Sequence, residues 1–276
     1  MTQHEKAEKL RALHEGPRTF WIPNPWDAGS AKLFASLGFE ALTTTSAGLA
    51  WVIGKADGGV TREDSLANAR MIVEAVDLPV AADLENGFGD RPEDAALTIR
   101  RAADVGLVGG SIEDYSGNPE RPIYDFSLAV ERVAAAAEAA HSLAIPFQFV
   151  ARCENWLHGV ADLDDTIRRL QAYEKAGADV LFPPGLKSLD DIRTVCQSVG
   201  KPVNIVIGPP DCRHSIADLA ACGVKRVSLG GSLARAAYTA ARTAAEELLA
   251  PGTLTFIKSI MTTADLNKVM TRQIEP

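Results

Sequence analysis

Between Thr19 and Leu249 the chain repeats one pattern about eight times: a short apolar segment, a turn and an amphipathic stretch. The apolar segments are typical of buried parallel strands, and the stretches between them have helical spacing. Because strict alternation of strand and helix predicts a parallel sheet, about eight units favour a closed (β/α)₈ barrel over an open doubly wound sheet. The expected strands are Thr19–Ile22, Ala41–Thr45, Val80–Asp83, Val108–Glu113, Phe147–Arg152, Val180–Phe182, Val203–Ile207 and Val227–Leu229. The expected helices are Ala28–Leu37, Arg62–Val76, Pro92–Val105, Ser127–Ser142, Asp164–Ala176, Leu189–Val199 and Ile216–Ala221.

The chain is expected to form a single domain. No linker or low-complexity segment interrupts the alternation, and no Gly-x-Gly-x-x-Gly fingerprint of a dinucleotide-binding domain opens the first helix. We expect one (β/α)₈-barrel domain over residues 1–276, with residues 250–276 as a C-terminal helical extension. Ser232–Leu249 has a helical pattern that continues through Thr253–Met270, beyond what a minimal barrel requires. Such an extension could lie across its own barrel or across a neighbouring subunit, and we favour the neighbour.

Composition limits the partners of this chain. Its 276 residues are 46% hydrophobic and 23% charged, which is ordinary for a globular protein with a substantial core. A net charge of -8 argues against nucleic acid as a partner. No segment approaches the roughly 20 apolar residues needed to span a bilayer, and the polar N-terminus lacks the apolar core of a signal peptide, so a cytoplasmic location is expected. Cys153, Cys196, Cys212 and Cys222 form no C-x-x-C pair and are expected to be reduced thiols.

Acidic residues gather where the expected strands end, which is the catalytic end of a (β/α)₈ barrel. Asp83 and Glu85 stand two residues apart at the end of the third strand, so strand alternation predicts that both side chains point the same way. Glu113 ends the fourth strand, whereas Asp114 should point to the opposite face. Three converging carboxylates predict a site for a hard cation, Mg²⁺ above all. The alternative is that Asp83 caps a helix and Glu85 is a solvated loop acid.

Other strand ends supply groups that could bind a substrate. On the fifth strand Arg152 shares a face with Gln148 and Val150 and should point into the barrel. Its guanidinium could clamp a substrate carboxylate or form a structural ion pair with the acids. The backbone N–H groups of Ser46–Gly48, after the second strand, could cradle an anion or form only a turn. Asn204, on the seventh strand, is a further candidate. His158 and His214 have no partner at metal-ligand spacing, so no zinc site is expected.

These segments resemble the isocitrate lyase/phosphoenolpyruvate mutase superfamily over nearly the whole of Thr19–Leu249. No single segment is specific, but their order and their placement at strand ends together are. The matching segments are Pro23–Ala31, Gly38–Ala41, Thr45–Gly48, Gly54–Gly58, Asp83–Gly89, Gly110–Asp114 and Ala151–Arg152.

The resemblance implies a barrel that exchanges its last helix with a partner subunit, in a homodimer or homotetramer. It implies Mg²⁺, with Mn²⁺ as a possible substitute, held partly through water, and a substrate whose 2-oxo or 2-hydroxy acid unit chelates that metal. The implied metal ligands are Asp83, Glu85 and Glu113, and the implied substrate contacts are Ser46, Ala47, Gly48 and Arg152. Asp57 would lie on a mobile loop and act in catalysis with Glu113 and Arg152. Asp83 and Asn204 are added as substrate contacts because they stand at strand ends.

The chain also departs from the lyases of this superfamily. They carry a Lys-Lys-Cys-Gly-His segment after the fourth strand, and its cysteine acts as a general acid or base. Here the corresponding residues, Asp114–Ile123, contain no cysteine, so isocitrate or methylisocitrate cleavage is doubtful. Asn118 could play the part of an asparagine found in the mutase and hydrolase branches. The sixth strand ends in Pro183–Gly185, where relatives often have Glu or His, which also argues against mutase chemistry.

The leading hypothesis is a Mg²⁺-dependent lyase or decarboxylase that cleaves a carbon–carbon bond in a small 2-oxo or 2-hydroxy (di)carboxylic acid through an enolate. Oxaloacetate, acids like 2-oxoglutarate and alkylmalates are the candidate substrates. The first alternative is a phosphonomutase, or a related activity on phosphonopyruvate. The second is a catalytically weak protein that binds 2-oxo acids.

Overall fold

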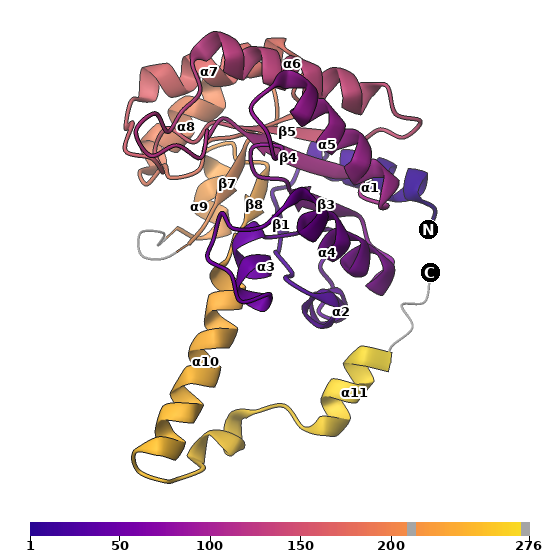
Figure 1. Cartoon of the computed structure of the whole chain (residues 1–276), viewed down its shortest axis with the longest axis vertical. Coiled ribbons are helices and arrows are strands. Elements are labelled where there is room, and N and C mark those ends of the chain that lie inside the picture. The colour runs from indigo at the N-terminus through magenta and orange to yellow at the C-terminus, as the bar shows by residue number, and fades with distance from the viewer. Residues whose placement is uncertain (209–213, 272–276) are drawn as a thin grey trace.

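The computed structural model describes residues 1–208 and 214–271, so Cys212 lies outside the described residues. Parallel strands and the helices around them form the expected α/β alternation (Figure 1). Within the described residues the strands are β1 Phe20–Ile22, β2 Leu42–Thr43, β3 Val80–Asp83, β4 Gly109–Glu113, β5 Gln148–Arg152, β6 Val180–Phe182, β7 Asn204–Val206 and β8 Arg226–Ser228. The helices are α1 Gln3–Glu15, α2 Ala28–Ser36, α3 Ser46–Val52, α4 Arg62–Ala75, α5 Pro92–Asp104, α6 Phe126–His141, α7 Leu163–Lys175, α8 Leu189–Ser198, α9 Ile216–Ala221, α10 Ser232–Leu249 and α11 Thr263–Thr271, with a short 3₁₀ helix, η1, at Thr255–Ser259.

The strands pair in parallel in two groups that adjoin at both edges. One group has the order β1-β8-β7 and the other the order β2-β3-β4-β5-β6. The amide of Thr43 donates a hydrogen bond of 3.1 Å to the carbonyl of Pro23, which links β2 to the end of β1. A parallel bridge between Leu181 and Val203 links β6 to the start of β7. The described strands therefore follow one another in chain order around a TIM-barrel-like curve, and their carboxyl ends meet on one side.

The two faces of β5 confirm the predicted alternation. Phe147 and Phe149 are buried in the large cluster between strands and helices. Val150 packs instead with Val180 and Phe182 in a separate cluster on the opposite face. Because successive side chains of a strand point to opposite faces, Arg152 lies on the face of Val150, inside the curve. The residue pattern of one strand thus fixes the direction of the functional arginine.

An N-terminal helix that the sequence pattern did not predict closes the other end of the barrel. Thr2 caps α1, since its hydroxyl accepts a hydrogen bond from the amide of Glu5 and its own amide donates to the Glu5 carboxylate. Ala7 and Leu10 of α1 are fully buried and pack in one cluster with Phe20 of β1. The apolar face of α1 is narrow, which explains why periodicity alone did not reveal it.

The C-terminal segment leaves the barrel and then returns to it. In Figure 1, α10 runs away from the strands, and α11 comes back beside α2. Lys32 of α2 donates a hydrogen bond of 2.7 Å to the carbonyl of Met270 in α11. Large apolar side chains on this segment remain exposed, among them Leu249 at 88% and Ile260 at 57%. The described chain thus leaves an apolar surface on its tail uncovered.

Two further observations concern the whole of the described chain. Within residues 1–208 and 214–271, no helix is both long and apolar enough to cross a membrane. Cys153, Cys196 and Cys222 are free thiols, as predicted.

Candidate active site

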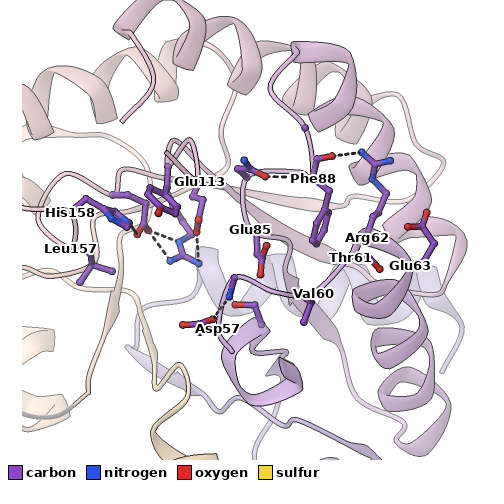
Figure 2. A pocket seen from close by; sticks show the side chains of 18 residues that line it. Asp57, Val60, Thr61, Arg62, Glu63, Glu85, Phe88, Glu113, Leu157 and His158 are labelled. Carbon is purple, nitrogen blue, oxygen red and sulfur yellow. Dashed lines mark hydrogen bonds and ion pairs between the residues drawn. The ribbon is translucent and has the colours of Figure 1, made fainter. Parts of the chain in front are cut away.

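Two adjoining cavities open at the carboxyl ends of the strands. The outer cavity, of about 810 Å³, is lined by Asp57, Glu85, Glu113, Arg152, Glu154 and His158, among others. The inner cavity, of about 200 Å³, also reaches Asp83 and extends between the strands to Arg226. Ser46, Asp57, Arg152 and Leu157 line both cavities, so a ligand could extend from one into the other. Figure 2 shows Asp57 and Glu85 facing the outer cavity, with His158 on one side and Phe88 on the other.

Arg152 is the central cation of the site. Its Nη1 lies 2.9 Å from Asp83 Oδ1 and 3.2 Å from Glu113 Oε2, and its Nη2 lies 2.8 Å from Glu154 Oε1. The guanidinium also stacks 4.9 Å from the ring centre of Phe182. Burial by itself would lower the pKa of Arg152, but the carboxylates of Glu154, Glu113 and Asp83 outweigh burial and raise it. Arg152 is therefore a permanent positive charge, and its ion pairs and substrate binding are compatible roles.

Asp83 is held in place from β2 and α3. Its amide donates a hydrogen bond of 3.1 Å to the hydroxyl of Thr44. Its Oδ2 accepts a hydrogen bond of 2.9 Å from the hydroxyl of Ser46. With Arg152 on Oδ1, both oxygens of the carboxylate have a partner. Asp83 therefore lies inside the site, and its Oδ2 also accepts a hydrogen bond of 3.3 Å from the amide of Ser46 at the start of α3, whose N-cap residue is Thr45.

The backbone conformation that directs Glu85 into the site differs from the continued strand that the sequence predicted. Strand β3 ends at Asp83, and Glu85 lies beyond it in a turn with φ of +46°. Phe88 in the same turn also has a positive φ, of +58°. A left-handed backbone is strained for residues other than glycine, and such strain clusters at functional sites. This turn, and not the alternation of a strand, directs Glu85 toward the outer cavity.

The acids of the outer cavity are poorly compensated. Burial, followed by the charges of Asp83 and Asp57, raises the pKa of Glu85 to about 7. Burial also raises the pKa of Glu113 well above its usual range, although Arg152 opposes the shift. Glu85 Oε1 is buried and has no hydrogen-bond partner in the part of the chain that the structure describes. The site therefore favours a proton or an additional cation near Glu85 and Glu113.

The segment Ser46–Gly48 forms the first turn of α3, not an isolated turn. Thr45 caps this helix, because its hydroxyl accepts a hydrogen bond of 3.2 Å from the amide of Gly48. Ser46 and Ala47 line the inner cavity, whereas Gly48 is not among its lining residues. The N–H group of Gly48 is thus already engaged. Ser46 and Ala47 are the members of the segment that line the cavity, and the hydroxyl and N–H groups of Ser46 already donate to Asp83.

Asp57 lies on the exposed loop between α3 and α4 and lines both cavities. Partial desolvation, followed by repulsion from Asp83, raises the pKa of Asp57. The loop therefore carries a carboxylate over the mouth of the site, which agrees with its expected position.

A buried network behind the strands supports Glu154. Asp114 points away from the site, as alternation predicted, and its Oδ1 accepts a hydrogen bond of 2.7 Å from the amide of Glu154. Its Oδ2 accepts a hydrogen bond of 2.5 Å from the hydroxyl of Tyr173 and lies 3.4 Å from Nη1 of Arg169. Burial raises the pKa of Asp114 to about 6. This network holds the residue that pairs with Arg152.

Sequence reasoning missed Glu154, Tyr115 and His158 as members of the site. His158 Nε2 lies 3.6 Å from Glu154 Oε2, and its ring stacks on Tyr115 with centres 3.8 Å apart. All three residues line the outer cavity. The two-residue spacing of Arg152 and Glu154 was a usable signal, because it predicts that both point to the same face. No local sequence pattern predicts that Tyr115 stacks on His158.

Two asparagines lie elsewhere. Asn118 is exposed on the loop after β4, lines a separate surface hollow and accepts a hydrogen bond from the amide of Glu120. Asn204 is fully buried, donates a hydrogen bond of 3.1 Å to Ser228 and has no partner for its Oδ1. Neither is among the lining residues of the outer or inner cavity.

The donors suit a hydrated divalent cation. Among the described residues, no three His, Cys, Asp or Glu side chains are arranged to hold a metal ion by themselves, and Arg152 lies between Asp83 and Glu113. The buried and unpaired Glu85 Oε1 nevertheless offers an oxygen ligand beside other carboxylates. Mg²⁺ usually binds one or two carboxylates directly and keeps several waters. The residues therefore fit a partly hydrated ion, and the assignment of Asp83, Glu85 and Glu113 as its ligands stays a prediction.

A TIM-barrel-like fold with an acidic site and a buried arginine at the strand ends defines a barrel enzyme. Residues 10–249 match the phosphoenolpyruvate phosphomutase family, and the chain belongs to this family. The predicted membership of the isocitrate lyase/phosphoenolpyruvate mutase superfamily is thereby confirmed. Homologues in it are carbon–carbon lyases, which supports the same class for this chain.

Similar proteins include both solved structures and a curated lyase. A crystal structure from Burkholderia cenocepacia J2315, assigned only in general terms as a lyase/mutase, is 52% identical with a TM-score of 0.96, over 98% of this chain and 97% of that one. A 2,3-dimethylmalate lyase structure is 30% identical with a TM-score of 0.86, over 98% of this chain and 95% of that one. The 2-methylisocitrate lyase of Escherichia coli strain K12 is 29% identical over 74% of this chain and 70% of its own length.

Proposed function

We propose that this chain is a Mg²⁺-dependent lyase that cleaves a carbon–carbon bond in a small 2-oxo or 2-hydroxy dicarboxylic acid. The observation that carries the proposal is the excess of carboxylates over cations in the site. Asp57, Asp83, Glu85, Glu113 and Glu154 lie around the guanidinium of Arg152, and the two cavities are also lined by the arginines Arg62 and Arg226. Such an excess fits a site that is completed by a divalent cation and its acid ligand.

In this proposal the acids hold the metal and the first turn of α3 holds the substrate. Asp83, Glu85 and Glu113 would bind Mg²⁺, or Mn²⁺ in its place, partly through water. When bound, the ion supplies an electrophile for the negative charge that develops on oxygen as the bond beside the carbonyl breaks. Ala47 would donate a backbone hydrogen bond to the substrate carboxylate, and Ser46 would join it by giving up a hydrogen bond to Asp83. Arg152 would contact the same anion without losing its charge.

The proton that carbon–carbon cleavage requires would come from the outer cavity. The chain lacks the lyase cysteine, and His158 is the imidazole that lines this cavity beside Glu154. Stacking on Tyr115 fixes the ring plane, and Glu154 orients one ring nitrogen. In a 2-hydroxy acid, a carboxylate of the outer cavity would take the hydroxyl proton as the new carbonyl forms and the carbon–carbon bond breaks. His158 would then deliver a proton to the carbon that leaves with the electron pair. The Asp57 loop would close over the site and exclude water.

The tail has a proposed role in assembly. We infer that residues 1–276 form one domain whose C-terminal helical extension, residues 250–276, is exchanged with a partner subunit in a homodimer or homotetramer, so that α11 contacts α2 of the partner in place of its own α2. The exposed Leu249 and Ile260 support this, because large apolar side chains of a tail gain by burial against a second barrel. A chain truncated after Leu249 should contain fewer subunits than the full chain, as the particle mass from light scattering divided by the mass of one chain. The same number of subunits in both would contradict the exchange.

A substrate panel tests the proposed activity. Purified protein with Mg²⁺ is incubated with oxaloacetate, 2-oxoglutarate and alkylmalates, and products are followed by proton NMR. EDTA treatment or Glu113→Gln should reduce turnover at least about 100-fold, since each weakens charge stabilisation in the transition state. Glu131→Gln, at an exposed position of α6, is the matched control. Turnover that survives both EDTA and Glu113→Gln would refute the proposal, and phosphorus NMR with phosphonopyruvate would reveal a mutase instead.

A further inference from the structure

An unpaired arginine lies at the inner end of the inner cavity. Arg226 begins β8, where it pairs in register with Phe20 of β1 and Asn204 of β7, and it is only 4% exposed. Its Nε and Nη1 atoms are buried and have no hydrogen-bond partner among residues 1–208 and 214–271. Burial with no compensating carboxylate lowers the pKa of Arg226 to about 10. A buried guanidinium without a partner is unfavourable, so its presence calls for a ligand.

The side chains around Arg226 are donors and neutral groups. Ser111, Thr43 and Ser228 line the same cavity and carry hydroxyl groups. Ser228 accepts a hydrogen bond from Asn204, which leaves its own hydroxyl proton available to a ligand. On the far side lies the buried His14 of α1, whose pKa is lowered to about 3, mainly by burial and further by Arg226, while a backbone contact with Leu10 opposes the shift. His14 is therefore neutral and provides no counter-charge.

The inner cavity is thus charged in opposite senses at its two ends. Asp57 and Asp83 line its mouth, together with Arg152, and Arg226 lines its inner end. The cavity of about 200 Å³ has room for roughly six water molecules at about 30 Å³ each, or for a small acid that displaces them. An acid whose 2-oxo end stays at the mouth would direct a second anionic group inward.

We propose that Arg226, with the hydroxyl groups of Ser111 and Ser228, forms an anion-binding subsite inside the barrel, separate from the acidic site at its mouth. The ligand is a carboxylate-sized anion: the second carboxylate of the substrate, or a small inorganic anion such as a halide. The assignment of the substrate's second carboxylate to this subsite rests on the function proposed above. The subsite itself is inferred from the unpaired guanidinium in the cavity and does not depend on that function.

Binding measurements on Arg226→Met and Arg226→Lys test the subsite. Calorimetry with Mg²⁺ compares pyruvate, which has one carboxylate, with oxaloacetate, 2-oxoglutarate and 2-oxoadipate. If the substrate supplies the anion, Arg226→Met weakens binding of the best dicarboxylate about 10- to 100-fold and leaves pyruvate unchanged. Arg226→Lys keeps the positive charge but loses the planar guanidinium with its paired N–H donors. Its affinity for the dicarboxylate should therefore lie between those of Arg226→Met and the wild type. Crystals soaked in bromide provide the second arm, since an anomalous peak beside Arg226 identifies a free anion.

A stability measurement separates ligand binding from a structural role. Removal of an unpaired buried charge should leave the melting temperature of Arg226→Met unchanged or higher. Arg132 is the matched control: it is also buried, but its guanidinium donates to the carbonyls of Gly89 and Asn86, so Arg132→Met should lower the melting temperature. If Arg226→Met does not fold, the affinities of Arg226→Lys and the bromide soak of the wild-type protein still test whether Arg226 binds an anion.

The outcomes distinguish the subsite from the proposed lyase function. Bromide at Arg226 without binding of any 2-oxo acid would support the subsite and refute the lyase proposal. Turnover with equal affinities in wild type and both variants, and no bromide peak, would refute the subsite and leave the lyase proposal standing.

Discussion

Nη1 of Arg152 lies 2.9 Å from Oδ1 of Asp83, and the two residues come from β5 and β3 with β4 between them. The same nitrogen lies 3.2 Å from Glu113 at the end of β4. One guanidinium therefore ties together the ends of three neighbouring strands. A substrate carboxylate that approaches Arg152 meets a cation whose orientation is already fixed, which reduces the entropy lost on binding.

Arg152→Lys tests this arrangement. An ammonium group retains the charge but cannot contact Asp83, Glu113 and Glu154 in one plane, so we expect the fold to persist and turnover to fall at least about 100-fold. Arg168→Lys, at an exposed position of α7, should keep full activity. Circular dichroism checks that the fold persists, and steady-state kinetics measures the turnover. If Arg152→Lys turned over substrate as fast as the wild type, the planar geometry of the guanidinium would be irrelevant to activity.

His158→Gln tests the proton donor. Glutamine fills similar space but cannot deliver a proton, so kcat should fall about 100-fold while KM changes little. The control is His141→Gln, because His141 is an exposed residue that lies beside Asp179, away from the site. An unchanged kcat would mean that another group protonates the product.

His14 makes the stability of the fold sensitive to acid. Burial, with the charge of Arg226, lowers its pKa from 6.5 to about 3 in the folded chain. The unfolded chain therefore takes up the proton first, and stability is lost as the pH falls from about 6.5 toward 3. In urea unfolding, the stability of His14→Leu relative to wild type should rise by about 2 kcal/mol between pH 8 and pH 5. His4→Gln, at an exposed position of the same helix, should show no such change.

Tyr173 supports the site from behind. Its hydroxyl donates a hydrogen bond of 2.5 Å to Asp114, which in turn accepts one from the amide of Glu154. Tyr173→Phe leaves a buried carboxylate with one partner fewer, so the free energy of unfolding should fall by about 1–3 kcal/mol. Tyr238→Phe, on the exposed face of α10, is the control. A Tyr173→Phe variant as stable as wild type would show that Arg169 and the Glu154 amide satisfy Asp114 without the tyrosine hydroxyl.

The elements of the barrel were predictable because their signals are local. Val80–Asp83, Val180–Phe182 and Ser232–Leu249 have the predicted bounds, since turn residues and caps mark their ends. The second strand was predicted too long, as Ala41–Thr45, because Thr45 caps α3 and cannot continue the strand. Helix α1 was not predicted, because few of its residues are apolar and its sequence therefore shows little helical periodicity.

The sequence by itself determined the alternating α/β fold and the superfamily, and it placed Asp83, Glu113 and Arg152 at strand ends, because strand parity and the position of chemistry in a barrel follow from residue order. Only the tertiary structure decided that Arg152 lies between two of the predicted metal ligands, that Glu154 and His158 belong to the site, and that Arg226 is buried without a partner. These facts depend on which strands and loops become neighbours, and contacts between residues far apart in the chain leave no local periodicity.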